Sequence, residues 1–98
     1  GYAIAVFLSV NQIASFSTDN LKSLPAVAVT ADGTAQNGPT LLSVLNRAGI
    51  KEFASVNVSG WSERRRDGDA HLTLRQEQLT DRVVLDFTNQ GTVKLAIK

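Results

Sequence analysis

The sequence predicts a single α+β domain over residues 1–98, with a mixed β-sheet, one main helix at about residues 39–48 and one short helix at about residues 18–24. A chain of 98 residues suits one domain with one modest core. Its hydrophobic content of 43% and charged content of 19% are typical of globular proteins. Helical patterns among short, turn-linked apolar runs favour helices packed on a mixed or antiparallel sheet, a β-grasp-like arrangement.

The N-terminal segment predicts a β-hairpin. Ala3–Val10 is apolar on both faces, which is typical of a strand covered on both sides or of one with a small-residue face. Asn11 and Gln12 predict a two-residue turn, and Ile13–Phe16 predicts the returning strand.

A short helix and a strand follow the hairpin. Ser17 and Thr18 offer hydroxyl groups that can cap a helix, and Pro25 ends it. Ala26–Thr30 then predicts a strand. The glycine-containing segment Asp32–Gly38 has no lysine and no phosphate-loop spacing, so we interpret it as a turn.

The main helix is predicted from Pro39 to Ala48. Proline suits the first helical turn, and Gly49 suits the left-handed position after the last turn. Its apolar stripe comprises Leu41, Leu42, Leu45 and Ala48, with Val44 at the edge of the stripe.

The C-terminal half predicts four strands and one short helical turn. We expect the helical turn within Arg75–Leu79, and Leu72 and Leu74 to point inward. The predicted strands are Ala54–Ser59, Ala70–Leu74, Arg82–Phe87 and Thr92–Ile97. The apolar first and last strands of the chain could lie at sheet edges, where unpaired backbone groups accept a partner strand.

Four short motifs occur in an order and spacing that resemble the molybdopterin-binding oxidoreductase domain of the sulfite oxidase type, over about residues 13 to 75. They are Leu24-Pro25, Gly38-Pro39-Thr40-Leu41, Ala48-Gly49-Ile50 and Asp67-Gly68-Asp69. The resemblance implies an α+β fold with a β-grasp-like part, and a bacterial, exported domain in the periplasm or outside the cell. Catalytic members bind molybdenum through a cysteine and are longer, whereas this chain has no cysteine. We therefore expect a shared scaffold without catalysis and with no cofactor.

Composition excludes several classes of function. With a net charge of +1, the chain lacks the one-sided basic excess of a nucleic-acid binder. Without cysteine and with one histidine, it lacks thiolate chemistry and the ligands of a structural zinc site. No apolar run reaches the ~20 residues of a membrane span. The chain begins with Gly1 rather than Met, so we expect an excised domain or a processed mature chain.

The predicted polar loop at residues 60–69 contains the candidate binding residues. Trp61, Arg64, Arg65, Arg66 and Asp67 join the one tryptophan of the chain to three consecutive arginines. Arginine binds carboxylate or phosphate through paired hydrogen bonds, and tryptophan offers a stacking face. The alternative interpretation is a solvated hairpin in which the nearby acids offset the arginines.

The sequence contains one candidate catalytic residue and one candidate metal site, and we interpret both as ordinary structural features. His71 is the one side chain with an ordinary pKa near neutrality, but no serine and acid are spaced to complete a catalytic assembly with it. Glu63, Asp67 and Asp69 carry hard-cation ligands, yet the intervening arginines repel a cation. We therefore predict neither a catalytic nor a metal site.

The function predicted from these observations is a non-catalytic binding or accessory module that contacts an unidentified protein or a small anionic ligand through residues 61–69. Two alternatives stay open. One is a cofactor-binding remnant that holds a pterin-like molecule in a deep, polar-lined pocket. The other is a structural or interaction domain that uses an exposed sheet edge. The oligomeric state is left open.

Overall fold

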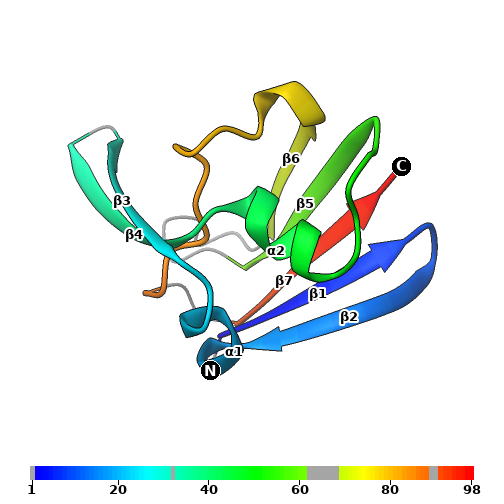
Figure 1. The fold of residues 1–98 in the computed structure, drawn as a ribbon, viewed down its shortest axis with the longest axis horizontal. Coiled ribbons are helices and arrows are strands. Elements are labelled where there is room, and N and C mark those ends of the chain that lie inside the picture. The colour runs from blue at the N-terminus through cyan, green and yellow to red at the C-terminus, as the bar shows by residue number, and fades with distance from the viewer. Residues whose placement is uncertain (1, 32, 62–68, 89–90) are drawn as a thin grey trace.

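A five-stranded mixed sheet forms the body of the domain in this computed structural model, which describes residues 2–31, 33–61, 69–88 and 91–98 (Figure 1). The strand order is β2-β1-β7-β5-β6. The elements in chain order are β1 (Tyr2–Leu8), β2 (Asn11–Ser17), α1 (Thr18–Lys22), β3 (Ala26–Ala31), β4 (Thr34–Pro39), α2 (Leu41–Arg47), β5 (Ser55–Trp61), β6 (Asp69–Arg75), the 3-10 turn η1 (Gln76–Gln78) and β7 (Gly91–Ile97). The predicted fold class, a mixed sheet with two helices, is confirmed.

The centre of the sheet is the parallel pair β1 and β7, which places the first and last strands of the chain side by side, with the two termini at opposite ends of the pair. Ile4 lies opposite Val93 and Val6 lies opposite Leu95, and all four side chains are buried. The expectation that the first and last strands could lie at sheet edges is therefore wrong. Strong apolarity reflects their central place, and the edges are β2 and β6.

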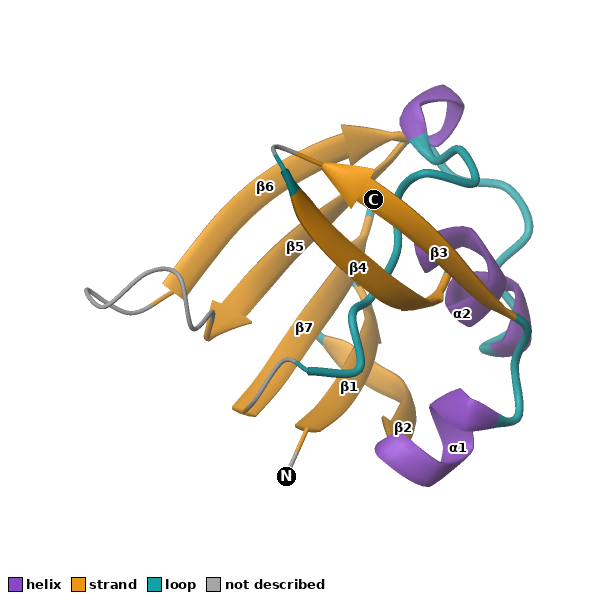
Figure 2. Ribbon diagram, turned by 90° about the vertical axis from the view of Figure 1, so that its left-hand side faces the viewer, coloured by secondary structure: helices purple, strands orange, loops and turns teal. Residues whose placement is uncertain are grey.

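One face of the sheet carries the core. Register places the large buried side chains of β1, β5 and β7 on a single face, and the helices α1 and α2 pack Leu21 and Leu45 into the same cluster. Figure 2 shows both helices on the same side of the sheet. The opposite face presents small and polar residues such as Ala3 and Lys94.

The β1–β2 turn lies two residues earlier than predicted. Ser9 and Val10 make the turn, and Ser9 adopts a left-handed φ of 59°. Asn11 and Gln12 belong to β2, where they pair with Leu8 and Phe7. The register then shifts between Val6 and Phe7, so that Ile13 is the extra residue of a bulge.

The short helix α1 begins where the sequence predicts. Ser17 is the N-cap: its hydroxyl accepts from the Asn20 amide at 3.2 Å, and its own amide donates to Asn20 Oδ1 at 3.0 Å. This reciprocal capping satisfies two backbone donors. The helix ends at Lys22, two residues before the predicted end, with Ser23 as its C-cap.

The turn predicted over Asp32–Gly38 is largely a strand. Residues 34–39 form β4, which pairs with β3 as a separate two-stranded sheet. The Arg82–Phe87 prediction is also wrong, because this segment joins no named strand. It does run antiparallel to β4: Leu85 N–H donates to Pro39 O at 2.8 Å and Phe87 N–H to Asn37 O at 3.0 Å. Since Pro39 has no N–H to return, the ladder is incomplete.

Helix α2 begins later than predicted. Thr40 is its N-cap, with its hydroxyl accepting from the Ser43 amide at 3.2 Å, so Pro39 ends β4 rather than opening the helix. Val44, predicted at the edge of the stripe, is fully buried, whereas Leu42 is half-buried. Gly49 has the predicted left-handed conformation, with φ 93°.

The other three predicted C-terminal strands form, and their burial departs from the prediction at Leu72. Strands β5, β6 and β7 and the turn η1 all form, and Val93, Leu95 and Ile97 of β7 are buried as expected. Leu72, predicted to point inward, is 54% exposed. Its register partner Val58 packs against the core, whereas Leu72 itself, on the edge strand β6, does not join that cluster.

The close approach of residues 83–87 to β4 can be tested at Gly38. A Cβ at this position would lie 1.9 Å from Leu85 O, so Gly38→Ala must displace backbone. We expect it to lower the free energy of unfolding by about 3 kcal/mol. Gly33→Ala is the control, because its Cβ meets no atom within 4 Å and it suffers only the strain of φ 76°, roughly 1 kcal/mol. Urea unfolding of both variants measures the difference, and equal losses would contradict the packing described.

Candidate functional site

The predicted binding loop connects β5 and β6 at the edge of the sheet. Arg64, Arg65, Arg66 and Asp67 lie outside the described residues. The backbone of Trp61 ends β5 and pairs with Asp69, the first residue of β6. The seven residues between them therefore join the two strands of an edge hairpin.

Gly60 determines how β5 enters this loop. It has φ 144°, and a Cβ there would lie 2.4 Å from Thr92 O and 2.8 Å from the Cα of Val93. Only glycine fits so close to the backbone of β7 with such a φ. The base of the loop is thus held against the central strands.

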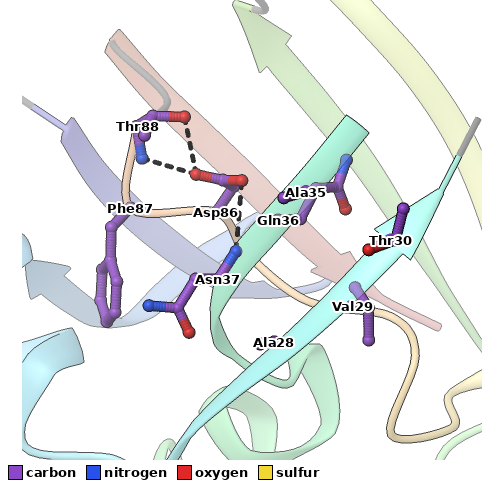
Figure 3. A pocket seen from close by; sticks show the side chains of 9 residues that line it. All are labelled: Ala28, Val29, Thr30, Ala35, Gln36, Asn37, Asp86, Phe87 and Thr88. Carbon is purple, nitrogen blue, oxygen red and sulfur yellow. Dashed lines mark hydrogen bonds between the residues drawn. The ribbon is translucent and has the colours of Figure 1, made fainter. Parts of the chain in front are cut away.

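A pocket lies elsewhere, between the β3–β4 hairpin and residues 86–88 (Figure 3). Its volume of about 460 Å³ falls within the range of small-molecule sites. The lining residues are Ala28, Val29, Thr30, Ala35, Gln36, Asn37, Asp86, Phe87 and Thr88. The pocket therefore combines small apolar side chains and one aromatic ring with amides, hydroxyls and one carboxylate.

Asp86 ties the two walls of this pocket together. Its Oδ1 accepts from the Thr88 amide at 2.7 Å and the Thr88 hydroxyl at 2.6 Å, while Oδ2 accepts from the Asn37 amide at 3.4 Å. The long Asn37 bond leaves Oδ2 with capacity for a ligand donor. Arg82 closes the far end of the hairpin, because its Nη2 donates to Thr30 O at 3.1 Å.

Apart from one local motif, no pattern in the sequence indicates this pocket. One wall is β4, interpreted as a turn, and the other is the segment interpreted as a strand of the sheet. Asp86 falls in the middle of that apolar segment, where its link to Asn37 depends on a contact 49 residues away in the chain. Its bonds to Thr88 are local and were the one recognisable feature.

Exposed apolar side chains occur at two places in the described part of the chain. Leu8, Val10 and Ile13 surround the β1–β2 turn, and Leu72 lies alone on β6. Scattered apolar side chains are common on protein surfaces. Leu72 differs because it lies on an edge strand that keeps a regular register with its neighbour, whereas Ile13 is the bulged residue of the other edge strand, β2.

One ion pair follows β6. Arg75 Nε donates to Glu77 Oε1 at 2.7 Å, with both side chains mostly exposed. A backbone hydrogen bond, and then the bond from Arg75, lowers the pKa of Glu77 below its ordinary value. A carboxyl group whose pKa is lowered by folding stabilises the folded state at pH values above its unfolded-state pKa. This stabilisation is lost as the pH falls through the folded-state pKa. Exposure keeps the contribution small.

Two kinds of feature are absent from the described residues. No three histidine, aspartate or glutamate residues within them are grouped to hold a metal ion. None of the helices in this part of the chain is long and apolar enough to cross a membrane. The position of His71 in β6 pairs its backbone with Ser59.

Comparison of the chain with protein-family models, with curated proteins and with solved structures finds no match.

Proposed function

We propose that this domain is a non-catalytic binding module that contacts a protein or a small anionic ligand through residues 61–69. The pairing of Trp61 with Asp69 at the end of the β5–β6 hairpin supports this proposal. It places the tryptophan position and three consecutive arginines in one connection at the sheet edge. Guanidinium groups bind carboxylate and phosphate by paired hydrogen bonds, which fits an anionic partner.

The proposal includes the scaffold that the sequence resembles. A sheet with a parallel central pair, a hairpin at one side and a helix across one face supports a β-grasp-like description, such as the sulfite oxidase-type resemblance implies. On this proposal the domain keeps the scaffold without the cysteine ligation and acts outside the bacterial cytoplasm. Binding, rather than turnover, is then its role.

The pocket beside Asp86 favours a second candidate function, a remnant that retains a pterin-like molecule. The 460 Å³ volume suits one fused bicyclic ring. The edge of a pterin carries adjacent N–H donors, and Asp86 Oδ2 is an acceptor with spare capacity. Phe87 provides an aromatic wall.

The loop proposal is tested by a triple variant. We expect Arg64→Ala/Arg65→Ala/Arg66→Ala to lose binding to partners that wild-type domain captures from a lysate of the source cell, since charge-assisted bonds contribute about 1.5–3 kcal/mol each. The control is Lys22→Ala/Lys51→Ala/Lys98→Ala, which removes the same charge at exposed positions elsewhere. Retention of every captured partner by the arginine variant, measured by pull-down and mass spectrometry, would refute the loop proposal.

The pocket proposal is tested by thermal shift with pterin as the probe. At tenfold excess over its dissociation constant a ligand adds about 1.4 kcal/mol, which raises Tm by roughly 6–11 °C for a domain of this size. We expect Asp86→Asn to abolish this shift and the exposed Asp81→Asn to keep it. No shift in wild type up to the solubility limit of pterin would remove the candidate.

A further inference from the structure

We propose that the β6 edge is a homodimer interface, in which β6 strands of two copies pair antiparallel about Leu72 and join their sheets. The inference concerns the sheet edge and does not depend on the loop or the pocket. It rests on three properties of β6: backbone groups that face outward, an exposed leucine and a sequence that complements itself when reversed.

The backbone register identifies which groups of β6 face outward. Ser55 O accepts from Lys98 N–H at 3.0 Å, so this residue of β5 faces β7. The direction of the backbone N–H and C=O groups alternates along a strand. The backbone groups of Val56 and Val58 therefore point toward β6, where Leu74 and Leu72 lie opposite. The backbone groups of His71 and Thr73 therefore face away from β5. They have no strand partner among the described residues.

The end of β6 agrees with this assignment. The amide of Arg75, two residues beyond Thr73, also faces outward, and it donates to Gln78 Oε1 at 2.8 Å rather than to β5. The turn η1 thus caps one end of the edge and leaves the middle of β6 available. A strand that pairs there gains the hydrogen bonds of the His71 and Thr73 backbones.

A second copy fits this edge in one favoured register. Antiparallel pairing centred on Leu72 aligns all seven residues of β6 and makes Leu72 face Leu72 of the other copy. Thr73 meets His71 of the other copy as a hydrogen-bonded pair. The register also places the acidic Asp69 opposite the basic Arg75. The neighbouring register centred on Thr73 shortens the overlap and sets His71 against Arg75 instead.

The other strand edges are less suitable. On β2 the bulge at Ile13 interrupts the regular spacing of the outward-facing backbone groups, and the Ser17 amide is already bonded to Asn20. On β3 the Thr30 carbonyl accepts from Arg82. Strand β6 keeps a regular register with β5 over its whole length. Its exposed leucine, which a β6 partner strand would cover, is 54% accessible.

The experiment combines sedimentation with disulfide trapping. We expect the wild-type chain to form a concentration-dependent dimer with a dissociation constant below about 1 mM, as suits a small interface. The chain has no cysteine, so one substitution introduces a unique thiol. Non-hydrogen-bonded antiparallel neighbours have Cα atoms about 4.5 Å apart, within the range of a disulfide. Leu72→Cys should therefore form a covalent dimer under mild oxidation.

Two matched variants make the result specific. Thr73→Cys projects from the other sheet face, and Ile13→Cys lies on the β2 edge; both positions are exposed. We expect Leu72→Cys to cross-link at least roughly tenfold faster than either, because only its thiols meet in the paired register. Circular dichroism confirms folding of each variant. A wild-type chain that stays monomeric to 1 mM, or faster cross-linking at Ile13 or Thr73, would overturn the proposal. Binding of an extended peptide from another protein by a monomeric chain would overturn it too.

Discussion

The parallel pairing of β1 with β7 is the constraint on which the rest of the fold depends. It joins the first and last strands of the chain along their full length and places Ile4, Val6 and Leu95 out of contact with solvent. Each such side chain contributes about 1.5–3 kcal/mol when it leaves water. Because two parallel strands need a crossover connection, every other element lies on the path between them.

The two hairpins of the sheet follow from this central pair. The β1–β2 hairpin extends the sheet on one side and the β5–β6 hairpin extends it on the other, so both sheet edges belong to hairpins. The candidate binding loop and the proposed β6 interface both lie on the second hairpin. Binding there leaves the central strands and their core undisturbed.

Much of the fold was predictable because local chemistry and apolar pattern agree. The cap at Ser17, the glycine at position 49 and the alternation in β7 each correspond to an observed feature. The misinterpreted segments have different causes. Thr34–Pro39 is a strand because it pairs along its whole length with β3. Residues 83–87 bond to β4 over a long sequence distance, and Pro39 prevents that segment from completing a ladder. Leu72 looks like a core residue by alternation, yet its exposure depends on which strand ends the sheet.

The candidate site was less predictable than the fold. Charge and composition single out Trp61 and the three arginines from sequence alone, and their binding role stays a prediction. The Asp86 pocket and the free β6 edge appear only when distant segments are placed together. A short polar sequence cannot reveal that Asn37 and Asp86 are neighbours.

Native-state hydrogen exchange tests the central role of the β1–β7 pair most directly. The account predicts that the amides of Ile4, Val6, Val93 and Leu95 exchange only through global unfolding, with protection equal to the full free energy of unfolding. The β3–β4 hairpin should open separately and exchange faster. If β1 and β7 amides exchanged as readily as those of β3 and β4, the pairing of the chain ends would not be what holds the domain together.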